Sequence, residues 1–518
     1  MTSFVLAVDL GTSGAKVALV STEGEIAAHT TEPTELRLLP GGGAEQDPDD
    51  WWRAICTASR GLLGDGTIPP DDVVALCMSS QWGGTVAVDA DGHHVHPAVI
   101  WMDSRGARHS RKLTGGGLTV PGTGYNARRL ATWLRRTGGV PSPTGKDPVG
   151  QVQWLRHEQP EAYAAARWFL DVPEYLTMRA SGQAVAGYDT AVLRWCSDNR
   201  DPHRVRWDEE LVVRCGFDPA TLPELRAPAS IVGPILPGAA RELGLGPHVQ
   251  VVTGTGDTTA AAVGAGTVLD HQAHLYVGTS AWLTCHVPYK KTDLRTNIAS
   301  LPAVVPGRYW VATVQDVAGK ALTWLADSIL YPGPDGPPAD LFTQLNGMAA
   351  AAPVGSGGVV FTPWLNGERT PVEDHRLRGS WSSLSLTTDR AALVRSVFEG
   401  VAYNTRWMLS AVEGFVKTRG GFDAITFVGG GAQSDLWCQT MADVLDRPIR
   451  RAVDPVLANA RGAGLIGAVA LGKLSWDQIP EQVAIQSTFD PDPTTWDTHR
   501  QGYRRFRGLH QATRKLHR

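Results

Sequence analysis

Two aspartates each stand beside a glycine-rich turn that follows a short apolar segment. Asp9 ends the β-favouring run that begins at Phe4, and Asp257 follows the glycine-containing segment 253–256. A carboxylate at such a turn can hold Mg²⁺, usually through water, and a partly buried one can accept the proton of an attacking hydroxyl. The structural alternatives are a turn-forming aspartate for Asp9 and a helix N-cap for Asp257. We interpret Asp9 as a metal-binding residue and Asp257 as a general base.

Three glycine-rich turns have the composition of phosphate-binding turns. Each follows an apolar β-type segment, and such turns present backbone N–H groups to an anion without obstruction by side chains. They are Gly11-Thr12-Ser13-Gly14, Gly278-Thr279-Ser280 and Gly429-Gly430-Gly431-Ala432. None has the lysine-containing P-loop spacing or opens as a G-x-G-x-x-G dinucleotide motif. An ordinary turn explains any one of them, but three together with Asp9 predict a nucleotide site.

Two polar segments in the first half have the composition of a sugar site. One contains Gln81, Trp82 and Gly83, and the other runs from Trp101 through Asp103 to Arg105. Both offer hydrogen-bonding groups beside an indole ring. The alternatives are core packing for the indoles and a surface ion pair for the two charged residues.

The composition favours a folded cytoplasmic protein and excludes several other classes. Apolar residues make up 42 % of the 518 residues and charged residues 19 %, with a net charge of −4. This balance predicts no nucleic-acid partner, and no segment is long and apolar enough to predict a membrane span. The six cysteines lack the paired spacing of a disulfide framework or a zinc site, and the N-terminus shows no signal-like block.

The strand–turn–strand pattern at the first Gly-Thr-Ser turn recurs near residue 278, which predicts two α/β lobes built on one plan, with a cleft between them. We expect the lobes to comprise residues 1–252 and 253–518. The pattern from 388 to about 415 predicts a long helix. The basic segment 500–518 predicts a surface helix, with a lipid- or nucleic-acid-binding tail as the alternative.

Taken together, these segments resemble the FGGY carbohydrate kinases of the actin/hexokinase-type ATPase superfamily. The resemblance runs in order over nearly the whole chain. Beyond the segments above, it rests on Glu45-Gln46-Asp47-Pro48, Gly367-Glu368-Arg369-Thr370-Pro371, Glu399-Gly400-Val401-Ala402 and Ala458-Asn459-Ala460-Arg461-Gly462-Ala463.

The resemblance implies two ribonuclease-H-like lobes that close over ATP and a sugar. It makes Asp257 the catalytic base and associates Mg²⁺ with Asp9. The implied ATP contacts are Gly11, Thr12, Ser13, Lys16, Gly278, Thr279, Gly319, Gly430, Gly431, Ala432 and Asp435. The implied sugar contacts are Gln81, Trp82, Gly83, Asp103, Arg105 and Asp257. A homodimer is a possible assembly.

Within the family the chain most resembles the members that convert D-xylulose to xylulose 5-phosphate. Those members carry Gln-Met-His-Gly where this chain has Gln81-Trp82-Gly83-Gly84, so an imidazole is replaced by a glycine. Loss of a hydrogen-bonding group at a sugar site changes specificity strongly. Another ketose, a sugar acid or a polyol therefore stays open as the acceptor. A more remote alternative is an actin-like ATPase switch that turns over no sugar.

Overall fold

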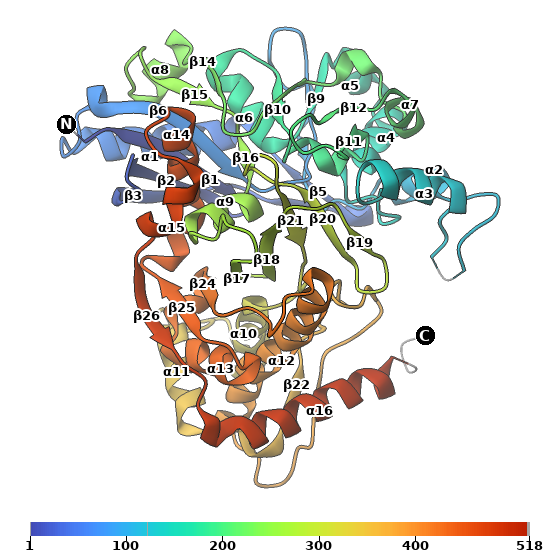
Figure 1. Cartoon of the computed structure of the whole chain (residues 1–518), viewed down its shortest axis with the longest axis vertical. Helices are drawn as coiled ribbons and strands as arrows, with labels where there is room; N and C mark the ends of the chain where they lie inside the picture. Colours follow the sequence, from blue (N-terminus) through green and yellow to red (C-terminus); the bar gives the residue numbers. More distant parts are fainter. Residues whose placement is uncertain (1, 122, 515–518) are drawn as a thin grey trace.

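The computed structural model describes residues 2–121 and 123–514. Two mixed β-sheets, each covered by helices, follow one another along the long axis of the molecule (Figure 1). The first sheet has the order β14-β15-β6-β1-β2-β3, with β16 also paired to β6. Its strands are β1 (Phe4–Gly11), β2 (Gly14–Ser21), β3 (Ile26–Pro33), β6 (Val73–Ser80), β14 (Ile231–Pro234), β15 (Gln250–Val252) and β16 (Thr255–Gly256).

The second sheet has the order β19-β20-β21-β18-β17-β24-β25-β26. Its strands are β17 (Ala273–Val277), β18 (Ala281–Val287), β19 (Thr292–Asp293), β20 (Ile298–Pro302), β21 (Tyr309–Ala312), β24 (Ile425–Val428), β25 (Ile449–Ala452) and β26 (Ile485–Phe489). In both sheets the first strand pairs antiparallel with the next strand of the chain and parallel with a later one. The predicted α/β fold of two ribonuclease-H-like lobes is confirmed.

Strand β1 is buried on both faces, which explains its unbroken apolar run. Leu6 and Val8 belong to a core with α1 and α6, whereas Val5 and Ala7 belong to a core with α9 and α14. These helices are α1 (Pro48–Gly64), α6 (Val172–Ser181), α9 (Asp257–Gly264) and α14 (Ala458–Ala470). Because side chains alternate along a strand, Asp9 lies on the α9–α14 face.

Helices α9 and α14 cross with their backbones in contact at the junction of the lobes (Figure 1). A Cβ on Gly264 would overlap the carbonyl oxygen of Ala458, and one on Gly462 would overlap that of Ala260. Helix α14 also packs on β1, β2 and β6, although it follows most strands of the second sheet in the sequence. The chain therefore returns to the first lobe to cover one face of its sheet.

The predicted long helix is α12 (Arg390–Val416), and the basic segment 500–518 falls largely in α16 (Trp496–Thr513). Phe506 of α16 is buried in the second-lobe core, where its ring lies 5.1 Å from that of Trp364. This packing supports the surface-helix interpretation for the described part, and residues 515–518 lie outside the described residues. Over the ranges that the structure describes, no helix is both long and apolar enough to span a membrane.

Candidate active site

Three neighbouring strands of the first sheet place polar residues side by side, in register, at the lobe junction. Asp9 of β1 pairs with Ser79 of β6, and Ser79 pairs with Thr255 of β16. Asp257 begins α9 two residues later. Ligands of α/β folds bind beyond the carboxyl ends of parallel strands, and both predicted carboxylates lie at that end.

Asp9 is 4 % exposed and contacts two groups from different parts of the chain. Lys16 Nζ lies 3.3 Å from Asp9 Oδ2, and Asn459 Nδ2 donates to Asp9 Oδ1 over 3.3 Å. Lys16 belongs to β2, directly across the hairpin, whereas Asn459 belongs to α14. The sequence motif around Asn459 did not predict a role for this residue. The one feature that could have indicated a role is a polar amide in a helix made mainly of small residues.

The oxygen atoms around Asp9 fit a Mg²⁺ ion. Ser79 Oγ and Asn459 Oδ1 are buried and, among the described residues, have no hydrogen-bond partner. Ser79 lies beside Asp9 on the same sheet face, and Asn459 contacts Asp9 directly. Buried polar atoms without partners are rare in native proteins, and Mg²⁺ prefers oxygen ligands and their associated waters.

Asp257 is partly buried at the first turn of α9. Its Oδ1 accepts the backbone N–H of Thr258 over 2.7 Å and its hydroxyl over 3.3 Å. Burial first, and the Asp9 charge second, raise the pKa of Asp257 to about 6. The N-cap residue of α9 is Gly256, so the N-cap interpretation of Asp257 is wrong. A carboxylate with this pKa is ionised at neutral pH and is basic enough to accept a proton.

Tyr276 of β17, in the second lobe, lies close enough to these carboxylates to be influenced by their charge. Burial, Asp9 and then Asp257 raise the pKa of its hydroxyl. Its ring stacks on Trp282 at 4.0 Å, and a Cβ on Gly278 would lie 2.8 Å from the Tyr276 ring. Sequence reasoning missed Tyr276 because an aromatic residue in an apolar strand is typical of core packing.

The second-lobe Gly-Thr-Ser turn is held by the start of α10 (Gly319–Leu325). The N–H of Gly319 donates to Gly278 O over 2.8 Å, and the N–H groups of Ala318 and Lys320 donate to Thr279 O over 3.0 and 3.2 Å. A side chain on Gly319 would overlap Gly278 O, so the close approach requires glycine. The structure thus brings together Gly278, Thr279 and Gly319.

The third glycine-rich turn follows β24, which is the parallel neighbour of β17. Gly429 has φ 89°, a left-handed conformation that favours glycine, and a Cβ on Gly431 would lie 2.8 Å from Val277. Gly430 is exposed and Ala432 is buried. The second and third turns are therefore adjacent.

Asp435 begins α13 (Asp435–Leu445), shortly after the third turn. Its side chain is exposed, and its Oδ1 lies 2.5 Å from Arg451 Nη1. The ion pair holds the carboxylate beside β25, which is the neighbour of β24.

On the first lobe, Gln81 is tied to the first Gly-Thr-Ser turn. Thr12 Oγ1 donates to Gln81 Oε1 over 3.1 Å, and Gln81 Nε2 donates to Gln46 Oε1 over 2.6 Å. Trp101 Nε1 donates to the same Thr12 hydroxyl over 3.1 Å. Trp101 is 38 % exposed, so its ring is not a core residue and can contact a ligand. Gln46 was not predicted as part of the site.

Asp103 and Arg105 form a mostly buried triad with Glu45, and the surface-pair interpretation is wrong. Asp103 Oδ2 accepts Arg105 Nε–H over 2.8 Å and the N–H of Ala44 over 2.9 Å. Arg105 Nη2 lies 2.6 Å from Glu45 Oε1, and the guanidinium stacks 3.7 Å above the Trp154 ring. The triad fixes β5 (Gly43–Gln46), and with it Gln46 and its partner Gln81.

Trp82 packs behind the catalytic candidate Asp257. A Cβ on Gly256 would lie 3.1 Å from the Trp82 ring, and Trp82 Nε1 donates to Thr190 O over 3.2 Å. The ring centroid also lies 5.8 Å from that of Trp310 in the second lobe. Trp82 therefore supports the segment that carries Asp257.

Gly83 adopts a left-handed φ of 83°, and its N–H donates to the buried carboxylate of Asp171 over 3.1 Å. A side chain at Gly83 would be strained and would crowd Leu193, whose Cδ1 would lie 3.1 Å from the Cβ.

Comparison with known proteins agrees with the two-lobe fold. Residues 4–264 match the N-terminal domain model of the FGGY family of carbohydrate kinases, and residues 273–471 match its C-terminal domain model. A xylulose kinase of Staphylococcus epidermidis is 27% identical, over 99% of this chain and 97% of the relative. A gluconokinase of Bacillus licheniformis is 24% identical, over 93% and 91% respectively. The crystal structure of ligand-bound xylulose kinase from Lactobacillus acidophilus has a TM-score of 0.84 at 21% identity and covers 99% of this chain and 98% of that one.

Proposed function

The chain belongs to the FGGY family of carbohydrate kinases, and from this premise we propose that it transfers the γ-phosphate of ATP to a hydroxyl of a xylulose-like ketopentose. Phosphotransfer to a sugar acceptor follows from the family, so an ATPase switch without sugar turnover is set aside. The observation that carries our assignment of the site is the position of Asp257. Its carboxylate has a raised pKa and lies within the electrostatic influence of Asp9 and Lys16 at the lobe junction.

In the proposed reaction Asp257 acts as the general base. The sugar hydroxyl oxygen attacks the γ-phosphorus, the bond from that phosphorus to the bridging oxygen of ADP breaks, and the hydroxyl proton passes to the Asp257 carboxylate. Positioning and charge stabilisation supply most of the acceleration in such transfers. The partly buried position of Asp257 supports this role, because burial keeps its pKa close to the pH at which a base works well.

The proposed ATP site is divided between the lobes. Gly11, Thr12, Ser13 and Lys16 from the first lobe, and Gly278, Thr279 and Gly319 from the second, would contact the phosphates. Gly430, Gly431, Ala432 and Asp435 would contact the adenosine. Bound Mg²⁺ would neutralise charge on the phosphate oxygens, and Asp9, Ser79 and Asn459 would hold it, partly through water.

The proposed sugar site lies on the first lobe, with Gln81, Trp101 and the backbone at Gly83 nearest the acceptor. Trp82, Asp103 and Arg105 would not contact the sugar and would instead hold the segments that carry the contacting residues in position. Arg105 already pairs with two carboxylates, so it offers little free charge to a sugar acid. This favours a neutral ketopentose, with D-xylulose giving xylulose 5-phosphate. A sugar acid is the second candidate, because one relative is a gluconokinase.

We further propose that two lobes close over the substrates in a cytoplasmic protein, divided near residue 252 except for β16 and α14, which pack on the first lobe. All six cysteines are buried and free, which supports a reducing compartment.

The proposed function is tested by measuring ADP release with D-xylulose, other ketopentoses, ketohexoses, polyols and D-gluconate. We expect D-xylulose to give the highest kcat/KM, whereas a higher value for D-gluconate would establish the sugar-acid alternative. Failure of every acceptor to stimulate ADP release would contradict the proposal. In the same assay Asp257→Asn should lose about 10²–10⁴-fold in kcat while still binding ATP. Asp71→Asn, at an exposed position, is the matched control.

A further inference from the structure

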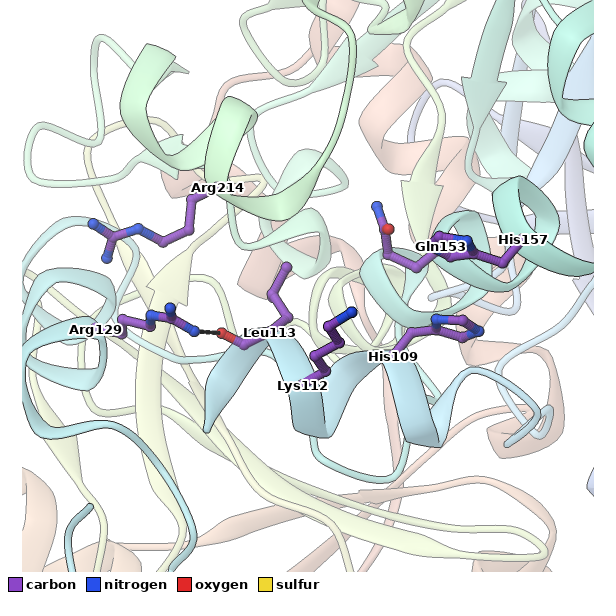
Figure 2. A pocket seen from close by; sticks show the side chains of 7 residues that line it. All are labelled: His109, Lys112, Leu113, Arg129, Gln153, His157 and Arg214. Atoms are coloured by element: carbon purple, nitrogen blue, oxygen red, sulfur yellow. Dashed lines mark hydrogen bonds between the residues drawn. The ribbon is translucent and has the colours of Figure 1, made fainter. Parts of the chain in front are cut away.

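A cavity of about 520 Å³ lies in the first lobe, among helices that do not carry the proposed catalytic residues. The helices are α2 (Ala107–Thr114), α3 (Ala127–Arg136), α4 (Pro148–Glu158) and α7 (Glu209–Cys215). Figure 2 shows the seven side chains that line it, His109, Lys112, Leu113, Arg129, Gln153, His157 and Arg214. The volume suits a small molecule.

The lining is strongly basic. It holds three permanent cations and two histidines, and none of its described residues is acidic. The imidazoles of His109 and His157 stack at 4.6 Å with an interplanar angle of 4°. The carboxylate near this end of the cavity is Glu158, whose Oε1 lies 3.6 Å from His109 Nε2 and also pairs with Arg108. Of the three permanent cations, Arg214 pairs with Glu210, whereas Lys112 and Arg129 form no ion pair among the described residues.

Two of the cations lack full pairing. Within residues 2–121 and 123–514, Lys112 makes no side-chain hydrogen bond and no ion pair. Arg214 Nη2 lies 2.6 Å from Glu210 Oε1, but Arg214 Nη1 is buried and has no partner among the described residues. Arg129 differs, because its Nη1 donates to the carbonyls of Leu113 and Gly115 over 2.6 and 3.1 Å. A buried, unpaired guanidinium N–H carries a substantial desolvation cost.

A second basic cavity provides a comparison. It is lined by Arg135, Arg136, Arg200, Arg206, Trp207, Asp208, Glu209 and Glu210. Here Arg136 pairs with Asp208 and Glu210, and Arg200 pairs with Asp198. Its charges are largely neutralised within the protein, so it has no comparable need for an anion.

We propose that the cavity at His109, Lys112 and Arg214 binds a small molecule that carries at least two phosphate groups. Figure 2 shows Arg129 and Arg214 at one end, the two histidines at the other, and Lys112 between them. The two guanidinium groups at one end and Lys112 in the middle match two separated anionic groups, and arginine guanidinium groups suit phosphate oxygens. Burial lowers the pKa of His109, so its imidazole adds an N–H donor rather than a charge. The site is distinct from the proposed ATP site, because none of its lining residues comes from the three glycine-rich turns.

The test uses tripolyphosphate, pyrophosphate and inorganic phosphate as probes, titrated calorimetrically into the full-length protein with ADP saturating. The charge-removing variant is Lys112→Gln/Arg214→Gln. The control, Arg111→Gln/Arg128→Gln, removes the same charge from exposed positions on α2 and α3. We expect tripolyphosphate to bind the wild type and the control equally and the charge-removing variant at least tenfold more weakly. Equal binding to all three proteins, or no binding to the wild type, overturns the proposal.

A second readout locates the bound probe. Tripolyphosphate should protect Lys112 from an amine-reactive reagent, measured by mass spectrometry, while exposed Lys473 stays reactive. Protection of Lys16 without protection of Lys112 would assign the binding to the ATP site and overturn the proposal. Inorganic phosphate should bind at least tenfold more weakly than pyrophosphate, and equal affinities would contradict the requirement for two phosphate groups.

Discussion

The protonation of Asp257 connects a single residue to the rate of the reaction. Burial and the neighbouring Asp9 charge both disfavour its ionised form, which raises its pKa to about 6. A general base must be deprotonated to act. The same environment that makes Asp257 a better base therefore also limits the pH range in which it is available.

We expect kcat/KM for the sugar to fall as pH decreases through about 6, tending to a tenfold loss per pH unit, because protonated Asp257 cannot accept the hydroxyl proton. A pH profile of initial ADP-release rates checks this. Asp257→Asn should show only a low residual rate without this acidic limb. An unchanged limb in that variant would assign the titration to another group.

Asp9 and Asp257, whose type and spacing suggested chemistry, lie at the lobe junction, but their supporting partners were not predictable. Asp9 precedes a glycine-rich turn and Asp257 follows one, so the local sequence was enough to identify both as candidate site residues. Asn459 reaches Asp9 from 450 positions away, and Tyr276 belongs to another sheet although its pKa is influenced by both carboxylates. Local sequence does not encode such contacts, which depend on how the two lobes pack.

At the scale of elements, the α9–α14 crossing joins the lobes through small residues. Gly264 and Gly462 let the two backbones touch, and Ala463 lies in the same core as Val5 and Ala7 of β1. Protein interiors are close-packed, so there is little space for an added methyl group at this crossing.

We expect Gly462→Ala to destabilise the protein by about 1–3 kcal/mol, because its methyl group would overlap the carbonyl of Ala260 and force the helices apart. Urea unfolding checks this. Gly414→Ala in α12 is the matched control, since a Cβ there meets no atom within 4 Å, and it should be neutral or stabilising. Equal stability of the two variants would contradict the tight crossing.

The β17–β18 hairpin buries two histidines that must stay neutral. Burial lowers the pKa of His274 to about 3 and that of His286 to about 4, and His286 Nδ1 shares a 2.8 Å hydrogen bond with Thr267 O. The unfolded chain takes up protons near pH 6.5 and the folded protein does not. Their contribution to stability is therefore present above pH 6.5 and is lost as pH falls towards 4.

We expect the free energy of unfolding to fall below pH 6.5 by up to about 1.4 kcal/mol per pH unit for each histidine. His286→Gln should show a shallower decline between pH 6.5 and 4, measured by urea unfolding at several pH values. His93→Gln, at an exposed position, should keep the wild-type slope. A wild-type slope in His286→Gln would show that His286 takes up its proton over the same pH range in the folded and the unfolded protein.

The elements themselves were largely predictable, whereas their neighbours were not. The hairpin at Gly11-Thr12-Ser13 and the long helix α12 follow from local patterns of apolar residues and turns. The pairing of β1 with β6 joins residues about seventy positions apart, and β17 joins β24 across about one hundred and fifty. Such pairings depend on long-range packing, which a single sequence does not specify locally.

At the scale of the whole molecule, the two lobes meet through fixed contacts as well as through the site. Lys290 Nζ donates to Leu134 O over 2.6 Å, and the Tyr309 hydroxyl donates to Asn199 O over 2.9 Å. The proposed ATP and sugar contacts lie on both sides of this junction. A ligand that holds the lobes together therefore prepares the site for the other ligand.

We expect D-xylulose to tighten the binding of a non-hydrolysable ATP analogue about fivefold or more, and the analogue to tighten sugar binding by the same factor. Calorimetric titrations with and without the second ligand measure both factors. Independent binding would contradict closure of the lobes over the two substrates.

The return of α14 to the first sheet has a consequence for synthesis of the protein on the ribosome. Val5, Ala7 and their neighbours cannot be fully covered until Ala470 has left the exit tunnel. At about 5–20 residues per second, the roughly two hundred residues between β16 and the end of α14 take on the order of 10–40 s. During that time the nascent chain presents an apolar sheet face. We therefore expect the growing polypeptide to be a client of chaperones until translation has passed α14.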